Sequence, residues 1–406
     1  MMQVERAFQV IMGSIHPLEP EWISTSAALD RILAETVLSP SDFPAADISS
    51  MDGYAMRYQD GCAAPCELQV METIPAGHLP SQTVQAGQTS RLFTGSLLPP
   101  GADTVIIQEN TQVLGDGRVK IVQPANQLGQ FVRKQGHYCR QGDPILRAGL
   151  ALGPAELGVL AALGRSVIPV GQRPQVALFS TGNELVRLDQ LPQAGQIVDS
   201  NQYALWAAIH KAGGIPTSWG ILPDDPQCLG TTMQSSIQRA DVVISSGGVS
   251  VGDYDYVEKL LAELGGQILI HSIAIKPGKP LTFAIFEKDP HRRCYFFGLP
   301  GNPVSALVTF WRFVQPALAK LQSQAPPWDP RCLTALAQSD LSGDGKRETY
   351  LWGSLNWQSD PPLFTPVLDY QSGNLINLAG CNGLAVVPVG VTGIAAQQPV
   401  RVMLLK

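Results

Sequence analysis

The sequence lacks a long hydrophobic segment. Apolar residues make up 45% of the 406 positions, yet no uninterrupted apolar run approaches the ~20 residues needed to cross a bilayer. Residues 1–15 form a short amphipathic pattern that carries Glu5 and Arg6, without the basic region, apolar core and cleavage site of a signal peptide. We therefore expect no membrane association and no export, and we expect the cytoplasm as the location.

Cysteines are few and show no metal-site spacing. The seven cysteines are an odd number, and they stand at positions 62, 66, 139, 228, 294, 332 and 381. No pair has the CxxC spacing of a zinc site, and Cys62 and Cys66 have no second pair to complete a tetrahedral set. We interpret them as reduced thiols with structural or incidental roles, as in a reducing compartment.

An excess of positive charge is also missing. The formal net charge is −6, which argues against nonspecific attraction to nucleic-acid phosphates. A Walker A sequence (GxxxxGK[ST]) is absent as well, which argues against an ordinary P-loop NTPase. An anionic ligand would have to be held by local cations and backbone N–H groups.

The length of the chain and the changes of sequence pattern along it predict several domains. At ~100–200 residues per domain, this length predicts two to four, and the plentiful Gly (39) and Pro (32) are spread over many turns. We expect a split, mixed and partly helical N-terminal domain (residues 1–46 with 140–175) and a small β domain inserted into it (47–139). After these we expect a central α/β domain with a mostly parallel sheet (176–325) and a small C-terminal β-barrel (326–406).

Short apolar runs alternate with helical patterns in the central part. This alternation predicts parallel strands covered by helices on both faces. The expected strands are 176–180, 242–245 and 295–298, and the expected helices are 202–212, 226–239, one ending near 264, and 304–320 with a kink near Pro316. Helical spacing also predicts helices at 26–37 and 154–163 in the N-terminal domain.

Three turns follow the predicted strands at residues 180–184, 245–253 and 298–303. Ligands of open α/β sheets bind beyond the carboxyl ends of the strands. Glycines allow backbone N–H groups to approach a ligand, and hydroxyl groups beside a helix start favour oxyanions. Any one turn could serve backbone geometry alone, but three at successive strand ends favour a single anion-binding edge.

Charged residues accompany these turns. Lys276 and Lys279 stand in a Lys-Pro-Gly-Lys-Pro segment, which suits an oxyanion, although a solvated surface turn has the same composition. Asp224 and Asp225 precede a predicted helix, and Asp255 follows the glycine-rich turn. Carboxylates near phosphates commonly bind Mg²⁺; helix capping is the alternative and is favoured for Asp225.

Two irregular polar segments of the inserted domain, 47–55 and 91–103, have little helical or strand periodicity. Such segments are often functional because loops carry sites while regular elements carry packing. Turn chemistry alone could explain either one.

Together, these segments resemble the molybdopterin molybdenumtransferases, a MoeA-like family that includes the C-terminal part of eukaryotic gephyrin. The matching segments follow the family's order over nearly the whole chain: 50–55, 93–103, 180–185, 199–201, 245–252, 276–280 and 298–305. The resemblance implies a homodimer whose site is shared between subunits. It also implies adenylyl-molybdopterin and molybdate as substrates, molybdenum cofactor and AMP as products, Mg²⁺ as the usual cofactor, and the upstream molybdopterin adenylyltransferase as a partner.

The resemblance also implies site residues. Carried over position by position, they are Asp52, Thr94, Glu184, Lys276 and Lys279 as catalytic residues, Asp224 and Asp255 as metal ligands, and Pro300, Pro303 and Arg347 as substrate-binding residues. The turns add further substrate-binding residues: Ser180, Thr181, Gly182, Ser246, Gly247, Gly248, Ser250, Gly252 and Asn302. Glu184, Asp52 and Thr94 are better assigned to positioning than to a named proton transfer.

Two positions depart from the family pattern. Tyr138 stands where members commonly carry an acidic residue, and Ser272 stands where some carry a basic one, so neither receives a role. Two other functions remain open at this point. One is a cofactor-binding scaffold without catalysis, and the other is a different phosphoryl- or nucleotidyl-transferring α/β enzyme.

Overall fold

The computed structural model describes residues 1–248, 256–289 and 292–405. They form two units, Met1–Glu35 with Ala148–Lys406 and Thr36–Arg147, and each unit is described by itself. The second unit extends beyond the 47–139 expected for the insertion because strand β2 (Val37–Leu38) pairs with β11 (Pro144–Leu146). Within the described residues, no helix is long and apolar enough to span a membrane.

The smaller unit is built on a six-stranded sheet. The strand order is β7-β4-β6-β5-β9-β8, with bounds Thr104–Ile107, Gly53–Met56, Gln88–Leu92, Cys66–Ile74, Arg118–Ile121 and Thr111–Val113. Alternate side chains of β4 enter different clusters, Tyr54 and Met56 in one and Ala55 in the other, as the two-residue period of a strand requires. The unit also contains β3 (Ile48–Ser49) paired with β10 (Val132–Arg133), and the short helix α2 (Tyr58–Gly61).

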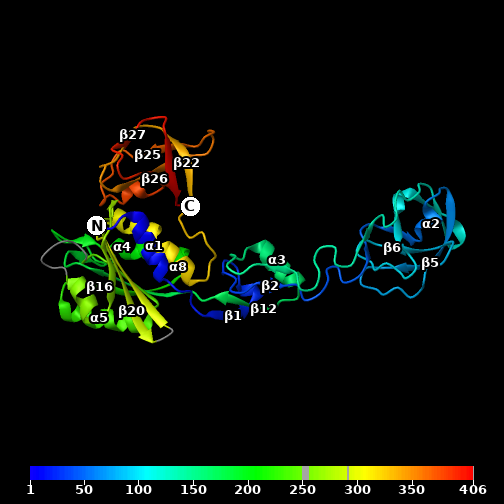
Figure 1. Cartoon of the computed structure of the whole chain (residues 1–406), viewed down its shortest axis with the longest axis horizontal. Helices are drawn as coiled ribbons and strands as arrows, with labels where there is room; N and C mark the ends of the chain where they lie inside the picture. Colours follow the sequence, from blue (N-terminus) through cyan, green and yellow to red (C-terminus); the bar gives the residue numbers. More distant parts are fainter. Residues whose placement is uncertain (249–255, 290–291, 406) are drawn as a thin grey trace. The chain divides into compact units, whose positions relative to one another are not determined.

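A second six-stranded sheet forms the centre of the larger unit (Figure 1). The order is β16-β13-β17-β21-β20-β18, with bounds Ile215–Leu222, Gln175–Thr181, Val242–Ser246, Arg292–Leu299, Pro280–Asp289 and Gln267–Ser272. The first four strands are mutually parallel. β20 and β18 continue the sheet in antiparallel pairing, so the predicted α/β fold class is confirmed with an antiparallel edge.

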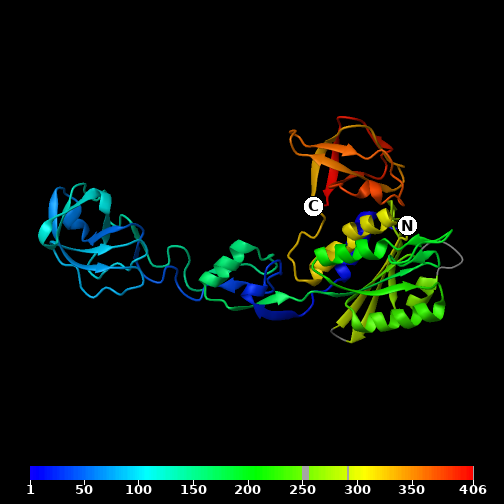
Figure 2. The same cartoon turned by 180° about the vertical axis from the view of Figure 1, so that it is seen from behind.

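Helices cover both faces of this sheet (Figures 1 and 2). One core cluster joins the sheet to the helices of the first face, which are α1 (Val4–Ser14), α4 (Asn201–Lys211), α7 (Pro303–Thr309) and α8 (Gln315–Leu321). A second cluster joins the other face to α5 (Pro226–Arg239) and α6 (Tyr256–Glu263). The break between α7 and α8 is a π-helical segment, Phe310–Val314, which ends before Pro316.

The prediction of a helix at 26–37 is wrong. Only a 3₁₀ turn, Thr25–Ala27, forms there, because bridges from Ile32 to Ala151 and from Leu33 to Val170 hold the chain extended. Long-range pairing thus overrides the local helical spacing. β1 (Pro20–Ser24) pairs with β12 (Val167–Gly171) nearby, and the predicted helix at 154–163 is confirmed as α3 (Pro154–Ala162).

The C-terminal part is a closed five-stranded β-barrel. Its order is β24-β25-β22-β28-β26, and pairing of β26 with β24 closes the ring; the bounds are Glu348–Asn356, Leu363–Pro366, Cys332–Ala337, Pro399–Leu404 and Gly383–Val387. A short strand from the α/β domain, β19 (Ile275–Lys276), pairs in parallel with β24. This pairing fixes the lysine-containing turn against the barrel. The remaining short pairs are β14 (Leu185–Val186) with β15 (Ile197–Val198) and β23 (Leu341–Ser342) with β27 (Gly393–Ile394).

Candidate functional site

A cleft of about 1030 Å³ lies at the carboxyl ends of β13, β17 and β21, and the barrel also contributes to its lining. Most of the predicted site residues line it together: Thr181, Gly182, Glu184, Asp224, Ser246, Gly247, Gly248, Lys276, Lys279, Pro300, Asn302, Pro303 and Arg347. They converge because parallel strands end at the same edge of a sheet.

The other predicted residues lie elsewhere. Ser180 is fully buried and does not line the cleft. Asp52 and Thr94 belong to the smaller unit. The remaining three, Ser250, Gly252 and Asp255, lie outside the described residues.

The turn after β17 depends on glycine. Gly247 and Gly248 have φ angles of +89° and +67°, and a Cβ on Gly247 would lie 2.4 Å from the Thr181 carbonyl oxygen. Only glycine adopts this backbone without strain, and its missing side chain lets a ligand approach the backbone of the turn closely.

Asp224 is held at the cleft by the end of β13. Its Oδ1 accepts a hydrogen bond from the Thr181 hydroxyl, and its Oδ2 accepts one from Asn183 N at 3.3 Å. Asn183 Oδ1 in turn accepts a hydrogen bond from Asp224 N at 3.3 Å. The carboxylate is therefore oriented before any ligand binds.

Two lysines supply positive charge to the same cleft. Lys276 is exposed and Lys279 is half-buried, and within the described part of the chain neither makes an ion pair. Gly278 between them has a φ of +113°, and a Cβ there would lie 2.7 Å from Thr309 Cγ2. The tight turn therefore presents both ammonium groups to the cleft, where they can pair with an anion.

Arg347 is anchored from the barrel side. Its Nε and Nη2 lie 2.7 and 2.6 Å from Asp344 Oδ2. Burial raises the pKa of Asp344, but hydrogen bonds from the backbone and side chain of Arg347 outweigh it and lower that pKa to about 2. Asp344 consequently stays ionised at neutral pH and orients the guanidinium.

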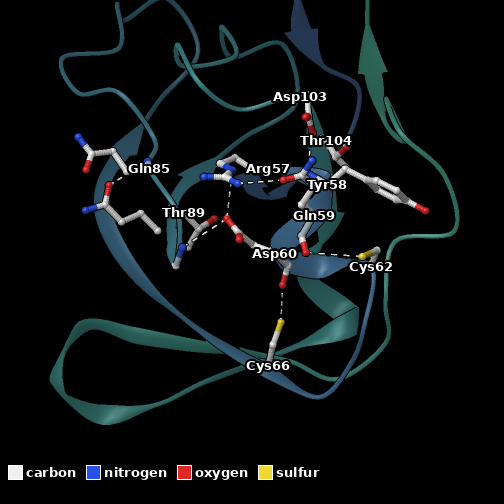
Figure 3. A network of polar contacts seen from close by, with 12 residues as sticks. Arg57, Tyr58, Gln59, Asp60, Cys62, Cys66, Gln85, Thr89, Asp103 and Thr104 are labelled. Carbon is white, nitrogen blue, oxygen red and sulfur yellow. Dashed lines mark hydrogen bonds and ion pairs between the residues drawn. The ribbon is translucent and has the colours of Figure 1, made fainter.

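In the smaller unit, Asp103 serves local structure. Its Oδ1 accepts hydrogen bonds from Tyr58 N at 2.7 Å and Thr104 Oγ1 at 2.9 Å, as Figure 3 shows within a wider polar network. In that network Arg57 lies 3.6 Å from Asp60, and the Cys66 thiol donates to the Asp60 carbonyl. Asp103 thus satisfies a backbone donor at the start of α2.

The two departures from the family pattern lie outside the cleft lining. Tyr138 is 55% exposed, and Arg133 lies over its ring at 5.0 Å. Ser272 ends β18, and its carbonyl accepts a hydrogen bond from Met2 N.

The lining also includes residues that received no role from the sequence, among them Asp199, Asn201, Tyr370 and Ser372. Ser372 Oγ accepts from Asn302 Nδ2 at 3.0 Å, and its carbonyl accepts from Val304 N at 3.1 Å. The 199–201 segment was visible as a family-like motif, whereas no local pattern marks Ser372 in its barrel loop.

The oxygen donors of the cleft suit a hard cation. Glu184, Asp199 and Asp224 all line it, and Asp199 Oδ2 is buried with no hydrogen-bond partner. Mg²⁺ usually takes one or two carboxylates together with water and phosphate oxygens. The described residues contain no cluster of three or more metal-ligating side chains.

The fold and cleft define a class: multidomain proteins in which an α/β domain and a β-barrel together line an anion-binding site. Three family models match successive parts of the chain. They are the MoeA N-terminal region (domain I and II) over residues 2–164, the probable molybdopterin binding domain over 177–320, and the MoeA C-terminal region (domain IV) over 334–405.

Individual relatives cover nearly the whole chain. A molybdopterin molybdenumtransferase of a Nostoc species is 48% identical over 392 residues, which is 95% of this chain and 89% of that protein. One from Synechococcus elongatus is 33% identical over 395 residues, 95% and 94% of the two chains. A crystal structure of a molybdopterin biosynthesis MoeA protein from Pyrococcus horikoshii has a TM-score of 0.85 at 31% identity and covers 100% of this chain and 99% of its own. The chain belongs to the MoeA family.

Proposed function

We propose that this protein is a molybdopterin molybdenumtransferase that takes adenylyl-molybdopterin and molybdate and releases molybdenum cofactor and AMP. One observation carries the proposal. A single cleft combines a glycine turn whose backbone a ligand can approach closely, two lysines without ion-pair partners among the described residues, and an oriented carboxylate. Such a cleft can hold a phosphate and an oxyanion side by side.

The two anionic groups would bind different parts of the cleft. Lys276, Lys279 and Arg347 would hold the molybdate oxygens, because cations and a guanidinium match an oxyanion. The Gly247-Gly248 turn would hold the phosphates, because it lines the cleft without side chains and lets a phosphate approach its backbone. This placement would bring the dithiolene and the oxyanion together, so proximity contributes to the rate.

Asp224, together with Asp255, would hold Mg²⁺. A magnesium ion held there would supply positive charge to stabilise the negative charge that develops on the phosphoanhydride as AMP leaves. The hydrogen bonds from Thr181 and Asn183 keep the Asp224 carboxylate pointing in one direction, so the chain itself supplies the orientation of this ligand.

Other parts of the proposal rest on family membership. We propose a homodimer in which Asp52 and Thr94 of one subunit contribute to a site of the other, with Glu184 positioning the substrate. The adenylylated substrate implies a molybdopterin adenylyltransferase upstream, and the cytoplasm is the proposed location.

One assay tests the proposal. Purified protein is incubated with adenylyl-molybdopterin and Mg²⁺, with and without molybdate, and AMP is followed by chromatography. AMP release that depends on molybdate is expected. A cofactor-binding scaffold would bind the adenylylated pterin without releasing AMP, and a different nucleotidyl-transferring enzyme would release AMP irrespective of molybdate.

A further inference from the structure

Asn201, which lines the cleft, connects the end of β17 to the turn after β21. Its side-chain Nδ2 donates to Ser246 Oγ at 2.6 Å and to the Gly301 carbonyl oxygen at 2.7 Å. Ser246 is the last residue of β17, directly before the Gly247-Gly248 turn, and Gly301 lies in the turn after β21. We refer to these two hydrogen bonds as the Asn201 bridge.

The orientation of the amide is fixed by its partners. Gly301 presents a carbonyl oxygen, which only accepts, so the nitrogen of the Asn201 amide must face it. Asn201 is 7% exposed and Ser246 is 2% exposed. The bond to Ser246 is buried, and the bond to Gly301 is partly buried. Loss of the first is costly, because the buried Ser246 hydroxyl would lose its donor.

The backbone beneath Asn201 is itself held firmly. Asn201 is the first residue of α4, and Asp199 Oδ1 accepts a hydrogen bond from Gln202 N at 3.2 Å. Ser200 O accepts another from Ala204 N at 3.1 Å. The helix start therefore holds the amide in place, and it transmits that position to both turns.

The two turns are also close neighbours in the sheet. β17 and β21 pair in parallel with Ser246 opposite Leu299, and Gly247 N donates to Leu299 O at 3.1 Å. A Cβ on Gly301 would lie 3.7 Å from Gly247 Cα. The Asn201 bridge adds a side-chain connection between the end of β17 and the turn after β21.

We propose that Asn201 is a positioning residue that fixes the spacing of the Gly247-Gly248 turn and the Pro300–Pro303 turn, so that both act on one bound ligand. The inference rests on the proposed function of the cleft, since the ligand is the adenylylated pterin. It assigns Asn201 no direct contact with the reacting atoms.

The test is Asn201→Asp, which keeps the shape of the side chain but removes both donors. Asn382→Asp is the matched control, because Asn382 also connects backbone groups. It accepts from Leu355 N at 2.6 Å and donates to Leu355 O at 3.2 Å, and it does not line the cleft. Asn201→Ser, which retains one donor, provides a second variant should the aspartate variant fold poorly.

Two readouts separate positioning from mere stability. Hydrogen exchange of the peptides covering 245–248 and 298–303 is expected to accelerate in Asn201→Asp and not in Asn382→Asp. Affinity for AMP is expected to fall about tenfold or more in Asn201→Asp and to change less than about twofold in the control, even where both variants lose thermal stability. Asn201→Ser should fall between wild type and Asn201→Asp in both readouts.

The outcomes also distinguish this inference from the proposed function. Unchanged exchange in both turns would overturn the inference whether or not the protein is a transferase. Molybdate-dependent AMP release by wild type, with AMP affinity alike in the two aspartate variants, would overturn the inference alone. Wild-type protein that neither binds nor releases AMP would overturn the proposed function. The hydrogen-exchange data would still show whether Asn201 holds the two turns.

Discussion

The Asp52 carboxylate accepts two hydrogen bonds from one residue, Thr94. Thr94 N donates to Asp52 Oδ1 at 2.7 Å and Thr94 Oγ1 donates to the same oxygen at 2.8 Å. The backbone bond, followed by the side-chain bond, lowers the pKa of Asp52 below its usual value. The pair joins residues adjacent to β4 and β6, where Gly53 pairs with Leu92.

Thr94→Val should raise the pKa of Asp52 toward its usual value, because the hydroxyl donor is lost while the backbone donor remains. Carboxyl NMR titration measures the change. Because the pKa of Asp52 is lower in the folded protein than in the unfolded chain, its ionised carboxylate stabilises the fold at pH values above the pKa of the unfolded state. This contribution is lost as the pH falls through the pKa of the folded state. The variant should therefore lose less stability on acidification than wild type. Thr111→Val is the control, because the Thr111 hydroxyl donates to the Gln108 carbonyl and not to Asp52. An unchanged pKa of Asp52 in Thr94→Val would contradict the role of the Thr94 hydroxyl.

Asp224→Asn combined with Asp255→Asn should abolish molybdate-dependent AMP release without unfolding the protein, because the proposed metal ligands lose their charge. Circular dichroism and thermal unfolding check the fold, and chromatography of AMP checks activity. Wild-type-like AMP release would remove the metal assignment.

Thr181→Val should increase the Mg²⁺ concentration needed for half-maximal activity several-fold, since the Asp224 carboxylate loses the hydroxyl that orients it. Mn²⁺ binding followed by electron paramagnetic resonance gives a second readout. Thr231→Val is the matched control, because Thr231 Oγ1 donates to the Gln227 carbonyl within α5. Equal cation affinities in the two variants would contradict the role of Thr181.

Asp344→Asn should weaken molybdate binding about tenfold, because a neutral amide orients the Arg347 guanidinium less strongly. Because the pKa of Asp344 is lowered to about 2, the Asp344–Arg347 pair stays charged. Its contribution to molybdate affinity in wild type should therefore be constant from about pH 5 to 9. Isothermal titration with molybdate measures both effects. Asp340→Asn, at a barrel residue that accepts from Ala396 N, should leave the affinity unchanged.

Asp103→Ala should destabilise the smaller unit by about 1–2 kcal/mol, because Tyr58 N and Thr104 Oγ1 lose their shared acceptor. Denaturant unfolding measures the free-energy change. Asp116→Ala removes an exposed ion pair with Arg118 and should cost less stability than Asp103→Ala, because solvent screens exposed ion pairs. A larger loss in Asp116→Ala than in Asp103→Ala would contradict this assignment.

The sequence predicted what depends on local patterns. The helix at 226–239 appears with those bounds as α5, since Asp225 caps it at Cys228 N and Pro226 suits its first turn. The turns at the strand ends were visible because glycine and hydroxyl residues follow apolar runs. Their convergence on one cleft followed from parallel strand order.

Features that depend on distant partners could not be read from the sequence. The pairing of Ile275–Lys276 with the barrel strand Glu348–Asn356 joins segments about seventy residues apart, and no local signal marks it. The Asn201 bridge likewise connects residues separated by 45 and 100 positions. The helix predicted from the apolar spacing at 26–37 does not form, because β-bridges to residues 151 and 170 hold the backbone extended there.

We propose that molybdate meets the adenylylated pterin in the cleft lined by Lys276, Lys279 and Arg347. Anomalous diffraction at the molybdenum absorption edge, from crystals soaked with molybdate, locates the metal directly. The account predicts a molybdenum peak within this cleft, within hydrogen-bonding reach of the two ammonium groups or the guanidinium. The contradicting result is a molybdenum peak elsewhere and none in the cleft, obtained with protein that releases AMP only in the presence of molybdate.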